Sequence, residues 1–149
     1  MKKKLIKRSI CPKAPSILIF ILLTTSFLLT PTLSSEPTDT LIWVNPATKT
    51  VSEGDTFDIT IEVDPAEPVK GVSCTLEFDP LIVTVDSVTV GSMFSFPGWG
   101  AIDNTAGKVT YIYGIDLSGT VDTAGILATV SFTAVNGGIS SLDLTNVEA

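Results

Sequence analysis

The stretch Phe57-Asp58-Ile59-Thr60-Ile61-Glu62-Val63-Asp64 alternates strictly between apolar and polar side chains. Successive side chains of a β-strand point to opposite faces of a sheet, so this alternation predicts a strand with one buried face. The same period of two recurs in Val72-Ser73-Cys74-Thr75-Leu76-Glu77-Phe78-Asp79. No window of about eleven residues carries a persuasive helical period. The chain is therefore expected to be all-β.

Six further segments have a strand-like composition and are separated by turns rich in Gly, Pro, Asn and Asp. They are residues 82–90, 108–116, 126–134 and 139–147, and the shorter runs 41–45 and 49–52. We expect a bend near Asp86 in the first segment and edge strands in the two short runs. About eight or nine short strands without a helix are typical of a β-sandwich or jelly roll.

The first thirty-five residues differ in composition from the rest of the chain. Six of the nine basic residues fall in the first thirteen positions, and the apolar residues 17–29 carry no charge. A basic start, a short apolar run and small polar residues form the layout of a secretory signal peptide. A membrane-spanning helix needs about 20 apolar residues, so an uncleaved anchor is the alternative. Either kind of segment exports the rest of the chain, and we predict an extracellular protein, secreted or anchored at the cell surface.

The chain is expected to divide into a signal peptide or anchor (1–35), a linker (36–40) and one domain (41–149). From residue 36 onward it has three basic and sixteen acidic residues, a net charge of −13. Nucleic acid needs a basic face, so no nucleic-acid partner is expected. We also expect no membrane contact beyond the N-terminal segment. The acidity suits solubility and the steering of a basic partner.

The sequence lacks the groups on which most catalytic sites depend. It has no histidine, which excludes Ser-His-Asp and Cys-His arrangements and removes the commonest transition-metal ligand. Cys74 is the only cysteine of the expected domain and lies on an apolar strand face, which predicts a buried, inert thiol. A calcium site at residues 64–67 or 116–122 is a weaker alternative, since neither has the ligand spacing of an EF-hand loop. We expect no catalytic residue, no metal site and no cofactor.

Seven motifs occur in the order typical of cohesin domains, and the chain resembles this family over about 110 residues. Residues 54–63 resemble the opening cohesin strand, and residues 71–83 resemble the next one, which ends in an aromatic-Asp-Pro turn. The other five motifs are residues 88–91, 107–110, 116–120, 125–132 and 142–147. The resemblance implies a nine-stranded jelly-roll β-sandwich.

Cohesins bind dockerin modules, which carry their own calcium, through the outer face of one sheet. The resemblance therefore implies a non-catalytic protein-binding module whose partner is a dockerin-containing protein. It places residues 73–77, 109–116 and 127–131 together on the binding face, and alternation along them selects the outward side chains. The partner-binding residues expected on this basis are Ser73, Thr75, Glu77, Tyr111, Tyr113, Ile115, Asp116, Leu127 and Thr129.

Two registers compete for the strand at residues 108–116. Matching the turn at residues 116–120 to the family displays the more apolar row outward, whereas the apolar pattern alone buries that row. The more apolar row is Val109, Tyr111, Tyr113 and Ile115, and the other is Thr110, Ile112 and Gly114. A shift of one residue decides whether the tyrosines belong to an interface or to the core. The best-studied cohesins carry acidic or amide side chains near Gly71 and Ser73, so partner specificity is not carried over.

A carbohydrate-binding module is the alternative function. Such modules stack sugar rings on exposed aromatic side chains, and the candidates here are Trp43, Trp99, Tyr111 and Tyr113, with the two tryptophans as the principal ones. Trp99 belongs to the aromatic loop 94–100, which forms either a sugar platform or, as we favour, a cap over the end of the sandwich. A structural cell-surface module is a third interpretation.

Overall fold

Nine β-strands and no helix make up residues 39–149, which are the part of the chain that the structure, a computed structural model, describes. The strands are β1 (Leu41–Asn45), β2 (Thr56–Asp64), β3 (Gly71–Glu77), β4 (Val83–Val90), β5 (Phe96–Gly98), β6 (Ala101–Asp103), β7 (Lys108–Ile115), β8 (Gly125–Ala134) and β9 (Asp143–Glu148). The predicted signal or anchor segment lies outside the described residues. Within those residues, no helix is long and apolar enough to cross a membrane.

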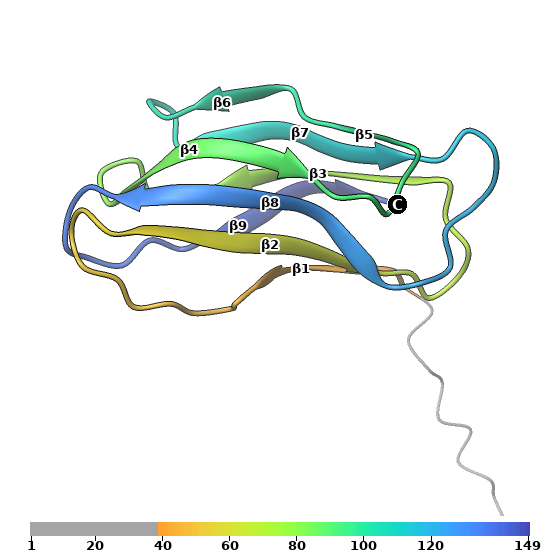
Figure 1. The fold of residues 1–149 in the computed structure, drawn as a ribbon, viewed down its shortest axis with the longest axis horizontal. Helices are drawn as coiled ribbons and strands as arrows, with labels where there is room; N and C mark the ends of the chain where they lie inside the picture. The colour runs from red at the N-terminus through yellow and green to blue at the C-terminus, as the bar shows by residue number, and fades with distance from the viewer. Residues whose placement is uncertain (1–38) are drawn as a thin grey trace, which may run out of the picture. The chain divides into compact units, whose positions relative to one another are not determined.

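Two antiparallel sheets pack face to face (Figure 1). One has the strand order β1-β2-β8-β4, and the other has the order β5-β7-β3-β9, with β6 also paired to β7. Residues 39–149 belong to one compact unit that contains all nine strands. The predicted all-β jelly-roll sandwich is confirmed.

The core lies between the sheets and is built from the apolar row of each long strand. In β2, Ile59, Ile61 and Val63 are buried, as their alternation predicts. The Phe132 ring of β8 stacks on Phe57, with ring centroids 5.5 Å apart, and meets the edge of the Phe78 ring at the same separation. Phe57 and Phe132 are neighbours in one sheet, and the contact of Phe132 with Phe78, which follows β3, joins that sheet to the other.

Cys74 lies in this core with 1% of its surface exposed. Burial in apolar surroundings raises the pKa of its thiol to about 11. The predicted burial of this cysteine is confirmed, and the protonated thiol is a poor nucleophile.

Several strand boundaries differ from the prediction, and local hydrogen bonds explain two of the differences. Residues 49–52 form no strand, because the backbone at Ser52 bonds within the turn that ends at Asp55. The last strand begins at Asp143 and not at residue 139; before it, the Ser140 hydroxyl accepts a hydrogen bond from the Asp79 backbone N–H at 2.9 Å. The predicted bend at Asp86 is confirmed as a β-bulge opposite β8.

The predicted aromatic loop contains a short strand of its own, β5. Phe94, just before it, points into the core and is buried, whereas Phe96 is exposed. Phe94 therefore closes this end of the sandwich, as the interpretation of the loop as a cap predicts. Trp99 does not take part in the core.

Candidate partner-binding face

An irregularity in β7 decides which of its side chains reach the surface. The strands β3 and β7 pair regularly on either side of Thr75, but opposite Thr75 itself β7 has two residues, Thr110 and Tyr111. This arrangement is a β-bulge, in which one extra residue changes the direction of the side chains after it. Tyr111 has a φ of 51°, in the left-handed region that non-glycine residues seldom adopt.

Because of the bulge, each of the two predicted registers is correct for only part of β7. Before the bulge, Val109 is fully buried, as the apolar pattern predicts. After it, Ile112 is buried while Tyr111 and Ile115 are 56% and 37% exposed, as the family register predicts. The expectation that Val109 points outward is thus wrong, and so is the alternative in which the tyrosines belong to the core.

The pairing of strands arranges the outward side chains of the five-stranded sheet in rows across its face. At one end, a charged row consists of Asp143, Glu77, Lys108 and Asp103. In the middle, Thr145 pairs with Thr75. At the other end lie two further rows, and we call this region the aromatic end. The first row consists of Glu148, Ser73, Tyr113 and Gly98, and the second of Gly71, Ile115 and Phe96; Tyr111 lies beside them.

Contacts between neighbouring side chains shape the aromatic end. The rings of Tyr111 and Tyr113 lie 5.0 Å apart at an interplanar angle of 39°. The Tyr113 ring extends over β5, where a side chain on Gly98 would collide with it. Phe96 is 56% exposed beside Ile115. Exposed aromatic and aliphatic groups on one flat surface have the composition of the centre of a protein interface.

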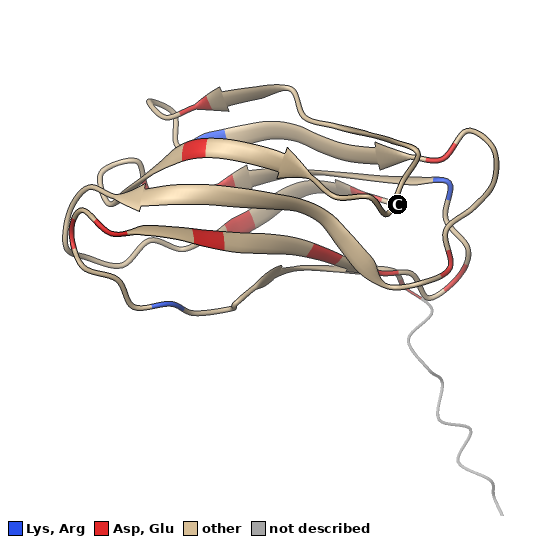
Figure 2. Cartoon of the chain, in the orientation of Figure 1, with Lys and Arg blue, Asp and Glu red and all other residues tan. Residues whose placement is uncertain are grey.

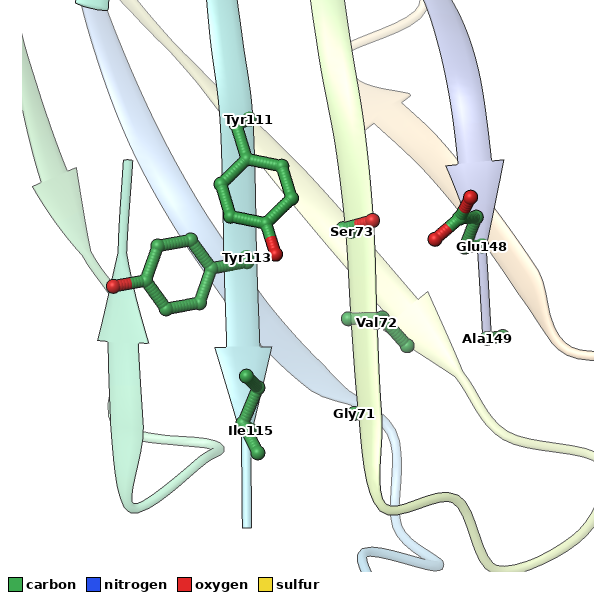
Figure 3. A pocket seen from close by; sticks show the side chains of 8 residues that line it. All are labelled: Gly71, Val72, Ser73, Tyr111, Tyr113, Ile115, Glu148 and Ala149. Atoms are coloured by element: carbon green, nitrogen blue, oxygen red, sulfur yellow. The ribbon is translucent and has the colours of Figure 1, made fainter. Parts of the chain in front are cut away.

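A depression of about 270 Å³ opens beside the two tyrosines (Figure 3). It crosses three neighbouring strands, from β7 over β3 to β9. Its lining residues are Gly71, Val72, Ser73, Tyr111, Tyr113, Ile115, Glu148 and Ala149. Four of the predicted partner-binding residues are therefore brought together here.

Asp116 comes directly after β7 and holds the adjoining loops in place. Its carboxylate accepts hydrogen bonds from the hydroxyls of Ser95 and Ser118, at 2.8 and 2.9 Å, and from the backbone N–H groups of Ser118 and Gly119. These bonds, that from Ser95 first, hold the pKa of this carboxyl below its ordinary value. A negative charge thus stands at the margin of the aromatic end.

The family model for the cohesin domain matches residues 42–145. This chain belongs to the cohesin family. The resemblance seen in the sequence is thereby confirmed. Cohesins are non-catalytic binding modules, so the expectation that the chain is not an enzyme is confirmed by its family.

Solved cohesin structures share the fold at low sequence identity. The sixth cohesin of scaffoldin B from Acetivibrio cellulolyticus, in complex with a Cel5 dockerin mutant, has a TM-score of 0.58 and 14% identity, over 72% of this chain and 82% of that one. The cohesin of the Clostridium thermocellum Coh-OlpA–Doc918 complex has a TM-score of 0.59 and 12% identity, over 73% and 83% of the two chains.

A cohesin described as non-cellulosomal, from the archaeon Archaeoglobus fulgidus, has a TM-score of 0.52 and 18% identity, over 64% of this chain and 67% of that one. At such identities the likeness shows the fold alone. None of the curated proteins compared with the chain matches it significantly.

Two residues that were expected on the face of this cohesin lie elsewhere. The strand β8 belongs to the four-stranded sheet, between β2 and β4. Leu127 is 1% exposed, so its expected outward orientation is wrong, and Thr129 points outward from the opposite sheet beside Thr60. Alternation shows which side chains of a strand share a face but not which sheet the strand joins. The strand that flanks β3 on its other side is β9.

The remaining expected residues differ in how much surface they offer. Ser73 is half-buried between Tyr113 and Glu148. Thr75 lies in the middle row but is only 9% exposed. Glu77 is exposed in the charged row, where it accepts a hydrogen bond from the Thr145 hydroxyl at 3.1 Å.

Sequence reasoning missed Phe96 and Glu148 at the aromatic end. The alternation Phe94-Ser95-Phe96 was a signal for a short strand that displays Phe96. Glu148 gave no such signal, because its place beside Ser73 depends on a bulge in β9, where Asn146 has a φ of 49°.

The two tryptophans of this cohesin are exposed to a similar degree, 38% for Trp43 and 39% for Trp99. Trp43 belongs to β1, at the edge of the four-stranded sheet that contacts β9, while Trp99 lies between β5 and β6, at the opposite edge of the other sheet. They therefore do not form one aromatic strip. Among residues 39–149, no three acidic or cysteine side chains gather as a set of metal ligands.

Proposed function

We propose that this cohesin is an extracellular module that binds a dockerin-bearing partner through the aromatic end of its five-stranded sheet. The partner carries its own calcium, so the cohesin contributes only a rigid surface. Apolar and aromatic side chains anchor the centre, Asp116 provides polar contacts at the margin of the aromatic end, and Glu77 in the charged row contributes to steering.

The observation that carries this proposal is the outward display of Tyr111, Tyr113, Ile115 and Phe96 on one flat face. A folded domain gains about 25 cal/mol for each Å² of apolar surface that it buries, so leaving Tyr111, Ile115 and Phe96 exposed and Tyr113 half-buried has a cost in the isolated domain. The cost is recovered when a partner covers them. Two of the similar structures are cohesins in complex with dockerins, which supports a dockerin as that partner.

Calorimetric titration of residues 37–149 against a panel of calcium-loaded dockerins tests the proposal. Tyr113→Ala is expected to weaken binding about 30-fold, since a central aromatic anchor contributes about 2 kcal/mol or more. Trp43→Ala is the control, because it removes an aromatic side chain from the outer surface of the other sheet, and it should change the affinity less than twofold. Loss of binding in both variants, or in neither, would move the contact away from the aromatic end.

Soluble β-glucans, titrated in parallel, test the carbohydrate alternative. The carbohydrate function would replace the docking proposal if the chain bound a glucan, if Trp43→Ala or Trp99→Ala abolished that binding, and if no dockerin bound. The separation of the two tryptophans on opposite edges favours the protein partner.

A further inference from the structure

The depression on the five-stranded sheet has two unlike walls (Figure 3). On the β7 side stands the ring of Tyr111, while the ring of Tyr113 is turned toward β5, and on the β9 side the Glu148 carboxylate is directed toward β3. The floor between them is β3, where Gly71 and Ser73 have small side chains that leave the space open. An aromatic wall and an anionic wall therefore face one another across a narrow polar floor.

We propose that this depression receives a cationic side chain, an arginine or a lysine, from the bound partner. The inference rests on the proposed docking function and names the chemistry of one contact within it. A guanidinium or ammonium group is attracted by the face of a tyrosine ring and forms a charge-assisted hydrogen bond with a carboxylate. The Ser73 hydroxyl supplies a further acceptor on the floor.

The spacing of the strands suits a side chain of this length. Glu148, Ser73 and Tyr113 lie in one row on three adjacent strands. Neighbouring strands are about 4.8 Å apart, which sets the backbone of Glu148 about 10 Å from that of Tyr113. A planar cation laid over Ser73 lies one strand away from β7 and reaches the ring of Tyr111 for a cation–π contact, whose range is about 6 Å, while it meets the carboxylate.

The charge of the domain favours a cation and disfavours an anion in this place. No lysine is among the lining residues: Lys108 lies in the charged row at the other end of the sheet, and Lys70 precedes Gly71 without lining the depression. Asp116 adds a second negative charge at the margin of the aromatic end. An acidic or neutral partner side chain would leave Glu148 without compensation in the interface.

A small probe tests the depression independently of any dockerin. Amide resonances of residues 37–149 are followed by NMR during titration with N-acetyl-arginine amide, and with N-acetyl-citrulline amide as its neutral isostere. With the arginine compound, we expect saturable shifts of the amide resonances of Ser73, Tyr113 and Glu148. The affinity for the citrulline compound should be at least fivefold lower. In the Glu148→Gln variant the arginine shifts should be absent. Equal shifts with both compounds, or arginine shifts spread over the acidic surface, would overturn the inference.

Dockerin titration then separates this inference from the proposed function. Glu148→Gln should weaken the binding of a dockerin about tenfold, whereas Asp64→Asn, which removes the same charge from the opposite sheet, should change it less than twofold. A dockerin that binds both variants as tightly as the natural chain would overturn the cationic contact and leave the docking function standing. Arginine shifts without binding of any dockerin would support the cationic site and overturn the docking function.

Discussion

At the scale of single residues, Tyr111 combines an unfavourable backbone with an exposed side chain. Its φ of 51° costs roughly 1–2 kcal/mol for a residue with a Cβ. Backbone conformations of this kind occur preferentially at functional sites, where the surrounding structure enforces them. In this protein the bulge enforces the conformation, and the result is the display of two adjacent tyrosine rings.

We predict that Tyr111→Gly separates stability from binding. Glycine relieves the left-handed strain, which offsets the lost contact between the rings and the greater entropy of the unfolded chain. The free energy of unfolding should therefore stay within about 1 kcal/mol of the natural value, while dockerin affinity falls about tenfold. Urea denaturation and calorimetry measure the two quantities. A large loss of stability would show that Tyr111 serves the fold and not the interface.

The buried thiol of Cys74 leads to a prediction about pH. The folded chain keeps the thiol proton up to a pKa of about 11, whereas the unfolded chain releases it near pH 8.5–9. Unfolding between these values releases a proton, so rising pH favours it. The contribution of Cys74 should be constant below about pH 8 and should then lower the free energy of unfolding by about 1.4 kcal/mol for each pH unit up to about 11.

Cys74→Ala provides the control for this titration, because tyrosines and lysines titrate in the same range in both proteins. The variant should be about 1–2 kcal/mol less stable at neutral pH, from the small cavity it leaves, and should lose less stability than the natural chain above pH 9. Parallel pH curves for the two proteins would contradict the assignment.

At the scale of elements, the sequence predicted strands better than it predicted their partners. Alternation located β2 within one residue and β3 within two residues at either end, because each has one apolar row facing a single core. The orientation of β7 was not predictable from its own residues. Its bulge is a feature of pairing with β3, and both candidate registers were locally reasonable. The sheet that β8 joins is likewise set by long-range pairing.

After the bulge, Gly114 of β7 faces the core, and its close packing there leads to a prediction. A Cβ at this position would overlap the Phe94 ring and press on Leu127, both of which are core side chains with little freedom to move. Gly114→Ala should therefore destabilise the domain by about 1–3 kcal/mol. Gly119→Ala is the matched control, since nothing lies within 4 Å of a Cβ there. Equal midpoints of thermal unfolding for the two variants would contradict the role of Gly114.

At the scale of the molecule, acidic residues are spread over both sheets and the loops (Figure 2). The function class and part of the proposed binding face could be predicted from the sequence, since the family motifs pointed to Tyr111 and Tyr113. The remainder of the face could not, because Glu148 and Phe96 reach it only through the pairing of β9 and β5 with their neighbours.

The net charge of −13 from residue 36 onward predicts how binding depends on salt. A partner with cationic contacts is drawn in by the field of the whole domain, and salt screens that attraction beyond a Debye length of about 10 Å at 0.1 M. The association rate should fall about tenfold between about 50 and 500 mM salt, while the dissociation rate changes about twofold or less. Surface-plasmon measurements with an immobilised dockerin resolve the two rates.

Two charge variants separate the effect of the overall charge on association from the effect of a direct contact on dissociation. Asp64→Asn and Glu148→Gln remove the same charge from the field, so both should reduce the salt dependence of association slightly and to a similar extent. Only Glu148→Gln removes a contact that forms once the partner is bound, and it alone should speed dissociation, by about tenfold. An association rate that does not respond to salt would mean that the acidity of this cohesin serves solubility and not the capture of its partner.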